Sequence, residues 1–226
     1  MNDLTVVIPV HKEDPSLVTK TYTELHALGC EVIVVDDGNT MDLDIPHLTY
    51  PGHVGYGYAI KHGVKHSTRP ITLSMDGDSQ HLVDDVKKLY TVYKLIDNCK
   101  MVVGQRWNLA ESGHRKWGRK ILNFIASCIA GHHMPDLNSG MRIFDTDMVR
   151  GYSPILCDTF SFTTSLTVAV VTDKHKMAYF PINVQPRASG KSHVKVVKDG
   201  FITLWYICTI GIALRTRKLR AKIRGR

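Results

Sequence analysis

The sequence is poor in cysteine, and its cysteines follow no pattern. It has five, scattered along the chain and without any C-x-x-C pair. This argues against a disulfide framework and against a zinc site, and it favours buried thiols in a reducing compartment. A signal-peptide pattern is also missing, because a strand pattern begins directly after the first three residues. We therefore expect a cytoplasmic protein.

Acidic residues are missing from the last twelve positions. That segment instead carries seven cations, which are Arg215, Arg217, Lys218, Arg220, Lys222, Arg224 and Arg226. The formal net charge is +8, and without these seven the other 22 cations nearly balance the 21 acids. The body of the chain is thus close to neutral, and its basicity is concentrated in a tail.

Repeats, low-complexity tracts and internal linkers are absent as well, and the 226 residues are enough to bury a substantial core. Short apolar runs alternate with helical patterns. The expected strands are Leu4–Pro9, Glu31–Val35, His47–Tyr50, Ile71–Met75, Met101–Gly104, a strand within Asp136–Phe144, and Met177–Val184. The expected helices cover 15–28, 55–66, 82–96, 117–129 and 160–171, the last of which could also be a strand. Since crossover connections are right-handed, we predict an α/β fold with a mostly parallel sheet flanked by helices.

Two carboxylates, Asp76 and Asp78, follow directly on the apolar run Ile71–Met75. Ligands gather at the carboxyl ends of the strands in open α/β sheets. Two like charges this close need a cation between them, and a hard divalent ion with oxygen ligands is the simplest one. Gln80 could add an amide oxygen. The alternative is an ordinary Asp-Gly-Asp surface turn that binds no metal.

Two further patterns suit anion binding without requiring it. Gly55 and Gly57 open a helix, where glycine permits close approach either to phosphate or to a packed neighbour. Arg106 follows a strand, and the next helix begins with the basic residues His114, Arg115, Lys116, Arg119 and Lys120. These cations could form an anion site or simply a solvated helix face.

The uncharged stretch Gly200–Leu214 precedes the basic tail. As a helix it would be roughly 22 Å long, which is too short for a bilayer core of about 30 Å. We expect an amphipathic helix in the membrane interface, with Trp205 and Tyr206 near the headgroups and the tail on anionic lipid. A helix packed on the sheet and a nucleic-acid-binding tail are the alternatives.

Taken together, the motifs resemble those of inverting family 2 glycosyltransferases with the GT-A (Rossmann-like) fold. The likeness covers nearly the whole chain and is strongest to dolichyl- and polyprenyl-phosphate sugar transferases, such as the dolichol-phosphate mannose synthases. The matching segments, in order, are Val7-Ile8-Pro9 with Glu13, Val34–Asn39, Gly55–Ala59 with Gly63, Asp76–His81, Asp136 with Ser139, Gly140 and Arg142, and Arg187 with Gly190, Lys191 and Ser192.

This resemblance implies an enzyme that moves a hexose from a nucleotide sugar, of the GDP-mannose or UDP-glucose type, to a polyprenyl or dolichyl phosphate. It implies nucleotide-sugar contacts by Pro9, Glu13, Asp37, Asp76, Arg187, Lys191 and Ser192. It also implies Mg²⁺ or Mn²⁺ on Asp76, Asp78 and Gln80, and acceptor-phosphate arginines at Arg106 and Arg115, with Arg119 beside them. The expected domains are a catalytic domain over 1–194 and a membrane-surface helix with its basic tail over 195–226, peripheral on the cytosolic face and without nucleic acid as a partner.

Some residues depart from the family pattern. His53 replaces an asparagine, Leu82 a proline, Met141 an aromatic residue, and Ser165 an acidic one in the helix that follows Phe160. Other functions therefore stay open. A hydroxyl acceptor on a glycan or protein would need a general base, for which Asp136 is the candidate. A membrane-binding module without catalytic activity is the remaining alternative.

Overall fold

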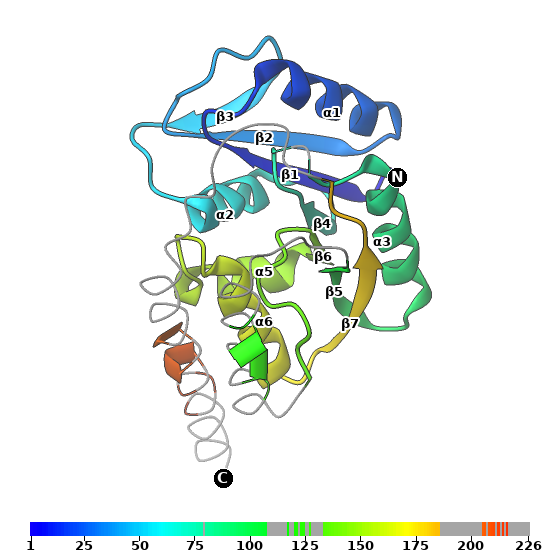
Figure 1. The fold of residues 1–226 in the computed structure, drawn as a ribbon, viewed down its shortest axis with the longest axis vertical. Helices are drawn as coiled ribbons and strands as arrows, with labels where there is room; N and C mark the ends of the chain where they lie inside the picture. The colour runs from blue at the N-terminus through cyan, green and yellow to red at the C-terminus, as the bar shows by residue number, and fades with distance from the viewer. Residues whose placement is uncertain are drawn as a thin grey trace.

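The computed structural model describes residues 1–78, 80–107, 117, 120–121, 123–124, 127, 133–185, 205–206, 208–210, 212, 214 and 216. These residues contain a seven-stranded sheet of order β3-β2-β1-β4-β6-β5-β7 (Figure 1). The strands are β1 (Leu4–Val10), β2 (Glu31–Asp37), β3 (His47–Tyr50), β4 (Ile71–Ser74), β5 (Cys99–Arg106), β6 (Arg142–Asp145) and β7 (Lys176–Ile182). The helices are α1 (Pro15–Ala27), α2 (Tyr56–His66), α3 (Val83–Leu95), α5 (Thr146–Tyr152), the 3₁₀ turn η1 (Ser153–Ile155) and α6 (Phe162–Thr172).

The sheet is mostly parallel, as predicted. β3, β2, β1 and β4 run parallel, and β5 runs parallel to β7. Only β6 is reversed, since it pairs antiparallel with both β4 and β5. The chain leaves β1 toward β2 on one side and returns to β4 on the other. This change of direction makes the carboxyl ends of β1 and β4 the topological switch point, which is where α/β sheets bind ligands.

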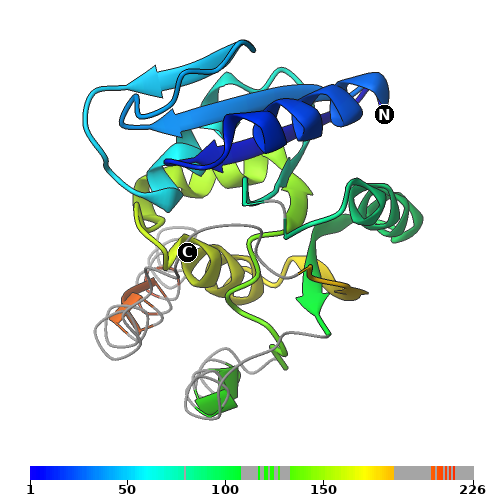
Figure 2. The same ribbon diagram turned by 45° about the horizontal axis from the view of Figure 1, so that its top comes forward.

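Each face of the sheet is covered by its own hydrophobic core, as the helices on either side in Figures 1 and 2 show. Successive residues of β1 alternate between the two: Val7 packs with α2 and α6, whereas Val6 and Ile8 pack with α1 and α3. This burial on both faces explains why the sequence of β1 is almost wholly apolar.

Where the chain is described, the predicted elements match the observed ones closely, with two exceptions; the predicted helix over 117–129 lies largely outside the described residues. The segment 160–171, ambiguous in the sequence, contains helix α6, which is buried along most of its length. α5 and η1 were not predicted. α5 is only seven residues long and begins at Asp145, whose side chain accepts a hydrogen bond from the Met148 amide. A helix this short carries too little periodicity to be recognised.

The C-terminal segment has two different faces. Ile210 and Leu214 are only 3% exposed and join the core beneath α6, with Tyr206 beside them. Trp205 and Ile212 are 69% and 63% exposed. The described residues of this segment thus pack on the core, as the alternative of a packed helix predicts, and also leave two apolar side chains exposed. No helix in the described part of the chain is long and apolar enough to cross a bilayer.

Candidate active site

Asp76 lies just beyond the carboxyl end of β4, and its carboxylate rests on the backbone of Gly140. A Cβ atom at Gly140 would overlap with both carboxylate oxygens, so only glycine leaves room for this placement. His81 approaches from the other side, and its Nε2 donates to Asp76 Oδ2 at 3.3 Å. Burial would raise the pKa of Asp76, but His81, the nearby Tyr56 hydroxyl and Arg106 together lower it.

Asp78 follows Asp76 by two residues, in the same turn beyond β4. The buried Tyr56 hydroxyl has no hydrogen-bond partner within bonding distance among the described residues. Burial and the charges of both aspartates raise the pKa of Tyr56 well above its usual value. Asp78 is 8% exposed, and its Oδ1 accepts a hydrogen bond from the Gln80 amide at 3.2 Å.

These residues fit a divalent cation that is shared with a ligand. No group of three or more His, Cys, Asp or Glu side chains in the described part of the chain could hold a metal ion alone. Asp76 and Asp78 supply two carboxylates, while the Gln80 side-chain nitrogen donates to the Gln185 carbonyl at 3.1 Å and leaves the amide oxygen as its ligating atom. Mg²⁺ is commonly bound by one or two carboxylates together with substrate phosphates. The donor set therefore suits Mg²⁺ or Mn²⁺ on a diphosphate.

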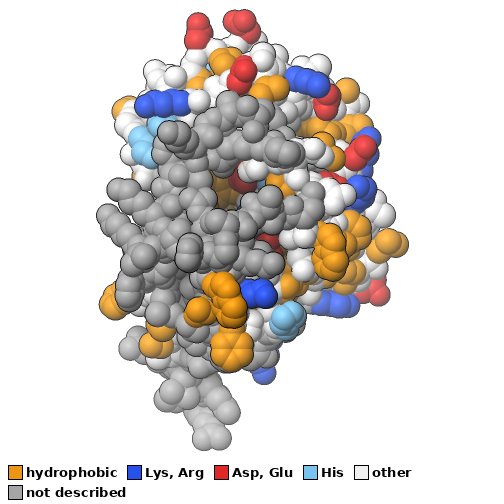
Figure 3. Space-filling model, in the orientation of Figure 1, with side chains coloured by type: hydrophobic (Ala, Val, Ile, Leu, Met, Phe, Trp, Pro, Cys, Tyr) orange, Lys and Arg blue, Asp and Glu red, His pale blue; other side chains and the backbone are white. Residues whose placement is uncertain are grey.

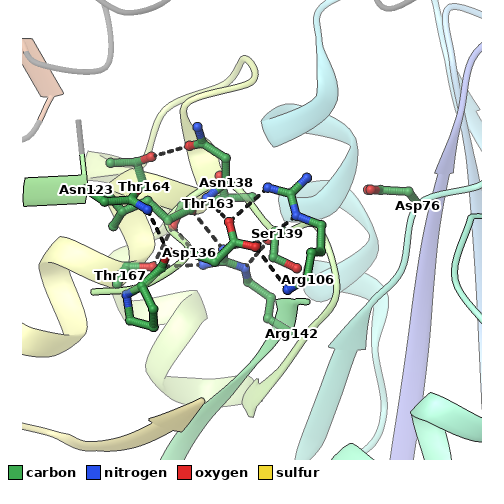
Figure 4. A network of polar contacts seen from close by, with 12 residues as sticks. Asp76, Arg106, Asn123, Asp136, Asn138, Ser139, Arg142, Thr163, Thr164 and Thr167 are labelled. Atoms are coloured by element: carbon green, nitrogen blue, oxygen red, sulfur yellow. Dashed lines mark hydrogen bonds and ion pairs between the residues drawn. The ribbon is translucent and has the colours of Figure 1, made fainter. Parts of the chain in front are cut away.

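Arg106, the last residue of β5, forms a bidentate ion pair with Asp136. Its Nε and Nη2 each donate at 2.9 Å to different oxygens of the Asp136 carboxylate, and its backbone amide adds a third contact at 3.2 Å. Asp136 is completely buried. Figure 4 shows the Arg106 guanidinium between Asp136 and Asp76.

Arg142 fixes the loop that carries both Asp136 and Gly140. Its side chain is completely buried and donates five hydrogen bonds, to the carbonyls of Leu137, Ser139 and Thr163 and to Thr167 Oγ1. These contacts fasten the 137–139 backbone to α6 (Figure 4). Arg142 is one of the residues that match the family pattern, but the resemblance implies no role for it. Its place at the start of an otherwise apolar strand is the sequence feature that indicates a buried structural arginine.

Asp37, at the end of β2, forms hydrogen bonds and an ion pair with residues of β3 and of the loop that follows it. Its carboxylate accepts hydrogen bonds from the Tyr50 hydroxyl at 3.0 Å and the Val54 amide at 2.8 Å, and it pairs with His53 Nδ1 at 2.8 Å. His11 Nδ1 donates to the Asp37 carbonyl at 2.8 Å, and the rings of His11 and His53 lie 4.2 Å apart. No sequence pattern indicates this histidine pair, apart from the departure at His53.

The predicted nucleotide residues Pro9 and Glu13 lie at the end of β1 and just after it, next to β2, which ends at Asp37. Pro9 is buried in β1 beside Val35 of β2, and Glu13 is half-buried in the turn that follows β1. Five other predicted residues lie outside the described part of the chain, and these are Arg115, Arg119, Arg187, Lys191 and Ser192.

The glycines that open α2 serve packing. A Cβ at Gly57 would overlap with the Cys157 carbonyl and the Phe162 side chain, and one at Gly63 would overlap with Val7. The Tyr58 amide donates to the Asp158 carbonyl at 2.8 Å. Of the two interpretations of this glycine pattern, close packing of α2 on its neighbours is the one that the structure supports.

Two departures from the family pattern have structural roles. Met141 is completely buried and packs in the core beneath α3. Ser165 is also buried; its hydroxyl donates to the Phe162 carbonyl at 2.8 Å and accepts from the Cys157 amide at 3.2 Å. Ser165 thus links α6 to the loop before it.

Comparisons with known proteins agree with this arrangement. Residues 5–152 match the model of the family described as glycosyl transferase family 2. The undecaprenyl-phosphate 4-deoxy-4-formamido-L-arabinose transferases of Salmonella typhimurium and Salmonella agona are 27% identical over 186 residues, which cover 70% of this chain and 56% of each relative. The chain thus spans about half the length of these curated relatives.

Solved structures share the fold at low identity. Glucosyl-3-phosphoglycerate synthase from Mycobacterium tuberculosis, in complex with Mn²⁺, UDP and phosphoglyceric acid, aligns with a TM-score of 0.74 at 12% identity, over 93% of this chain and 78% of that one. Its complex with Mg²⁺ and UDP gives 0.72 at 12% identity, over 92% and 79%. Because the family model covers well over half of the residues, the chain belongs to glycosyl transferase family 2, and the described residues have its GT-A fold.

Proposed function

We propose that this glycosyltransferase moves a hexose from a nucleotide sugar, of the GDP-mannose or UDP-glucose type, to a polyprenyl or dolichyl phosphate. The observation that carries the proposal is the juxtaposition of an acidic pair, Asp76 and Asp78, with the buried ion pair of Arg106 and Asp136. The first suits a metal-bound donor diphosphate and the second an anionic acceptor. The names of the Salmonella relatives, which are undecaprenyl-phosphate transferases, support a lipid phosphate as the acceptor class.

On the donor side, negative charge develops on the diphosphate as the anomeric carbon–oxygen bond breaks. A divalent ion on Asp76, Asp78 and Gln80 would supply a fixed positive charge at that position. Pro9, Glu13 and Asp37 would contact the base and ribose at the ends of β1 and β2. The further nucleotide-sugar contacts are proposed for Arg187, Lys191 and Ser192.

On the acceptor side, a lipid phosphate is already an anion, so its oxygen can attack the anomeric carbon without a general base. Arg106, with Arg115 and Arg119, would hold that phosphate. Asp136 is completely buried, and both of its oxygens accept from Arg106. This engagement supports a role in positioning Arg106 and disfavours Asp136 as the base for a hydroxyl acceptor.

The C-terminal segment supports a location of the protein at a membrane surface. We propose that residues 1–194 form the catalytic domain and that 195–226 hold it, as a peripheral protein, on the cytosolic face of a membrane. The exposed Trp205 and Ile212 would enter the interface, and the seven tail cations would contact anionic lipid. An apolar face directly before the charges favours lipid over nucleic acid.

The test is to incubate the protein with GDP-mannose or UDP-glucose, Mn²⁺ and a short polyprenyl phosphate. We expect a lipid-linked sugar from one donor, and its loss on removal of the metal and in Asp78→Asn. Calorimetry with each nucleotide sugar, with and without Mn²⁺, identifies the donor. Transfer to a hydroxyl acceptor without lipid phosphate, abolished by Asp136→Asn, would support the alternative acceptor class instead. Absence of metal-dependent nucleotide affinity would contradict both.

A further inference from the structure

All three tryptophans of the chain lie on the surface. Trp107, Trp117 and Trp205 are 76%, 69% and 69% exposed. Tryptophan is the largest apolar side chain, and leaving its ring in water forgoes a substantial burial free energy. Where a ring has one apolar body and one polar N–H, the boundary between lipid and water satisfies both.

Trp117 belongs to an apolar stripe on one helical segment. Trp117, Ile121 and Phe124 are spaced as i, i+4 and i+7, which places them on one face, and they are 69%, 54% and 69% exposed. Lys120 lies beside this stripe, with its Nζ 6.0 Å from the Trp117 ring. The stripe is therefore an exposed apolar face with a cation at its edge.

The same segment is fastened to the protein through other residues. The Asn123 side chain donates to the Pro135 carbonyl at 2.6 Å, and Ser127 Oγ accepts from the Met134 amide at 2.9 Å. Residues 134 and 135 lead directly to Asp136, which holds Arg106. The exposed stripe is thus linked by short, direct contacts to the acceptor side of the site.

Two of the segments that carry exposed apolar residues lie at one end of the molecule. The described parts of 117–127 and 205–216 lie at the lower end in Figures 1 and 2, away from β1, β2 and β3. Figure 3 shows one group of hydrophobic side chains toward its lower end and others farther up. Trp107 directly follows Arg106 in the chain. We call Trp117, Ile121, Phe124, Trp205 and Ile212 the tryptophan surface.

We infer that the tryptophan surface is a lipid-docking surface for an anionic bilayer, and that the stripe Trp117–Ile121–Phe124 is a second membrane contact beside the C-terminal segment. The charge of the segment favours lipid over a second copy of this chain, because Lys120 lies within a sequence that also carries Arg115, Lys116 and Arg119. Such a cluster would repel its own copy and attract anionic headgroups. Docking would bring Arg106 to the lipid boundary, and only this last consequence rests on the proposed function.

The experiment is flotation of the full chain with mixed phosphatidylcholine–phosphatidylglycerol vesicles and with pure phosphatidylcholine vesicles. We expect binding to the mixed vesicles and at least about tenfold weaker binding for the double variant Trp117→Ser/Phe124→Ser, since two apolar anchors are lost. Leu95→Ser, which removes a side chain that is 76% exposed at the end of α3, is the matched control and should float like the wild type. Both variants should melt at the wild-type temperature.

Two outcomes would overturn the inference. One is a double variant that floats as well as the wild type. The other is a wild-type dimer in solution that the double variant abolishes, which would make the stripe a contact between copies. Asp78→Asn separates this test from that of the proposed function: we expect it to lose metal-dependent nucleotide affinity and yet to float normally.

Discussion

The placement of Asp76 depends on residues behind it that never need to touch a substrate. Gly140 supplies the space for the carboxylate, His81 donates to it, and Arg142 holds the loop on which Gly140 lies. Ligand groups of a metal are commonly oriented by such outer contacts. The glycine and the arginine of this motif thus act on the candidate metal site through backbone position.

This arrangement predicts the effect of Gly140→Ala. The added methyl group would overlap with the Asp76 carboxylate, which is the mobile end of a side chain, so the carboxylate should move while the fold is kept. We expect Mn²⁺-dependent nucleotide affinity to fall about 10- to 100-fold, as outer-contact changes usually cause. Calorimetry with GDP or UDP and Mn²⁺ measures this affinity, and the melting temperature checks the fold.

Gly151→Ala in α5 is the matched control. No heavy atom lies within 4 Å of a Cβ built at Gly151, so this substitution should leave nucleotide affinity as it is in the wild type. An unchanged affinity in Gly140→Ala would show that Asp76 does not bind the metal from its observed position.

At the scale of elements, Glu31 joins three parts of the sheet at the end opposite the site. From the start of β2 its carboxylate accepts hydrogen bonds from Thr5 of β1 and, at 2.9 Å and 2.8 Å, from the amide and hydroxyl of Thr68, which precedes β4. Burial acts to raise the pKa of Glu31, but these hydrogen bonds and the charge of Arg69 lower it below its usual value.

A lowered pKa gives a definite sign to the pH dependence. The stabilisation by Glu31 is fully present above the pKa of this residue in the unfolded chain, about 4.3. It is lost as the pH falls through the lower pKa of the folded state. We expect urea unfolding to show that Glu31→Gln is less stable than the wild type at neutral pH and that the difference shrinks in acid. Glu24→Gln, on an exposed helix pair with Lys20, is the control. A difference that stayed constant between neutral and acid pH would contradict the prediction.

The elements of the sheet were predictable where their pattern was strong, and the exceptions have physical causes. β1 and β4 are buried along their whole length and β2 over its last four residues, so apolar residues dominate these strands. β6 is a four-residue strand that begins with a buried arginine, and nothing local in its sequence reveals that it runs antiparallel between β4 and β5. Strand order depends on long-range contacts that a single sequence does not display.

The candidate site was predictable to a similar degree. Asp76, Asp78 and Asp136 belong to motifs of fixed spacing, whereas the pairing of Arg106 with Asp136 joins residues thirty positions apart. The ring contact of His11 with His53 likewise joins two loops that only the fold brings together. Motifs therefore gave the chemistry of the site, and the sheet topology supplied its geometry.

At the scale of the whole molecule, charge and apolar surface are separated along the chain. The body is nearly neutral and the tail is basic, while the exposed tryptophans lie on segments that follow β5 or approach the tail. The basic tail and the proposed catalytic residues thus lie on different stretches of sequence. This separation makes the attachment of the C-terminal segment to the fold a question of its own.

That attachment gives the last prediction. Leu214 and Ile212 lie two residues apart on the same helical segment, yet Leu214 is 3% exposed in the core beneath α6 and Ile212 is 63% exposed. If the segment is part of the folded domain, Leu214→Ala should lower the free energy of unfolding by about 2–4 kcal/mol, whereas Ile212→Ala should change it by less than about 0.5 kcal/mol. Urea unfolding measures both. Equal stability of the two variants would mean that the segment is not packed on the core, and the docking helix would then be attached to the enzyme only through the chain.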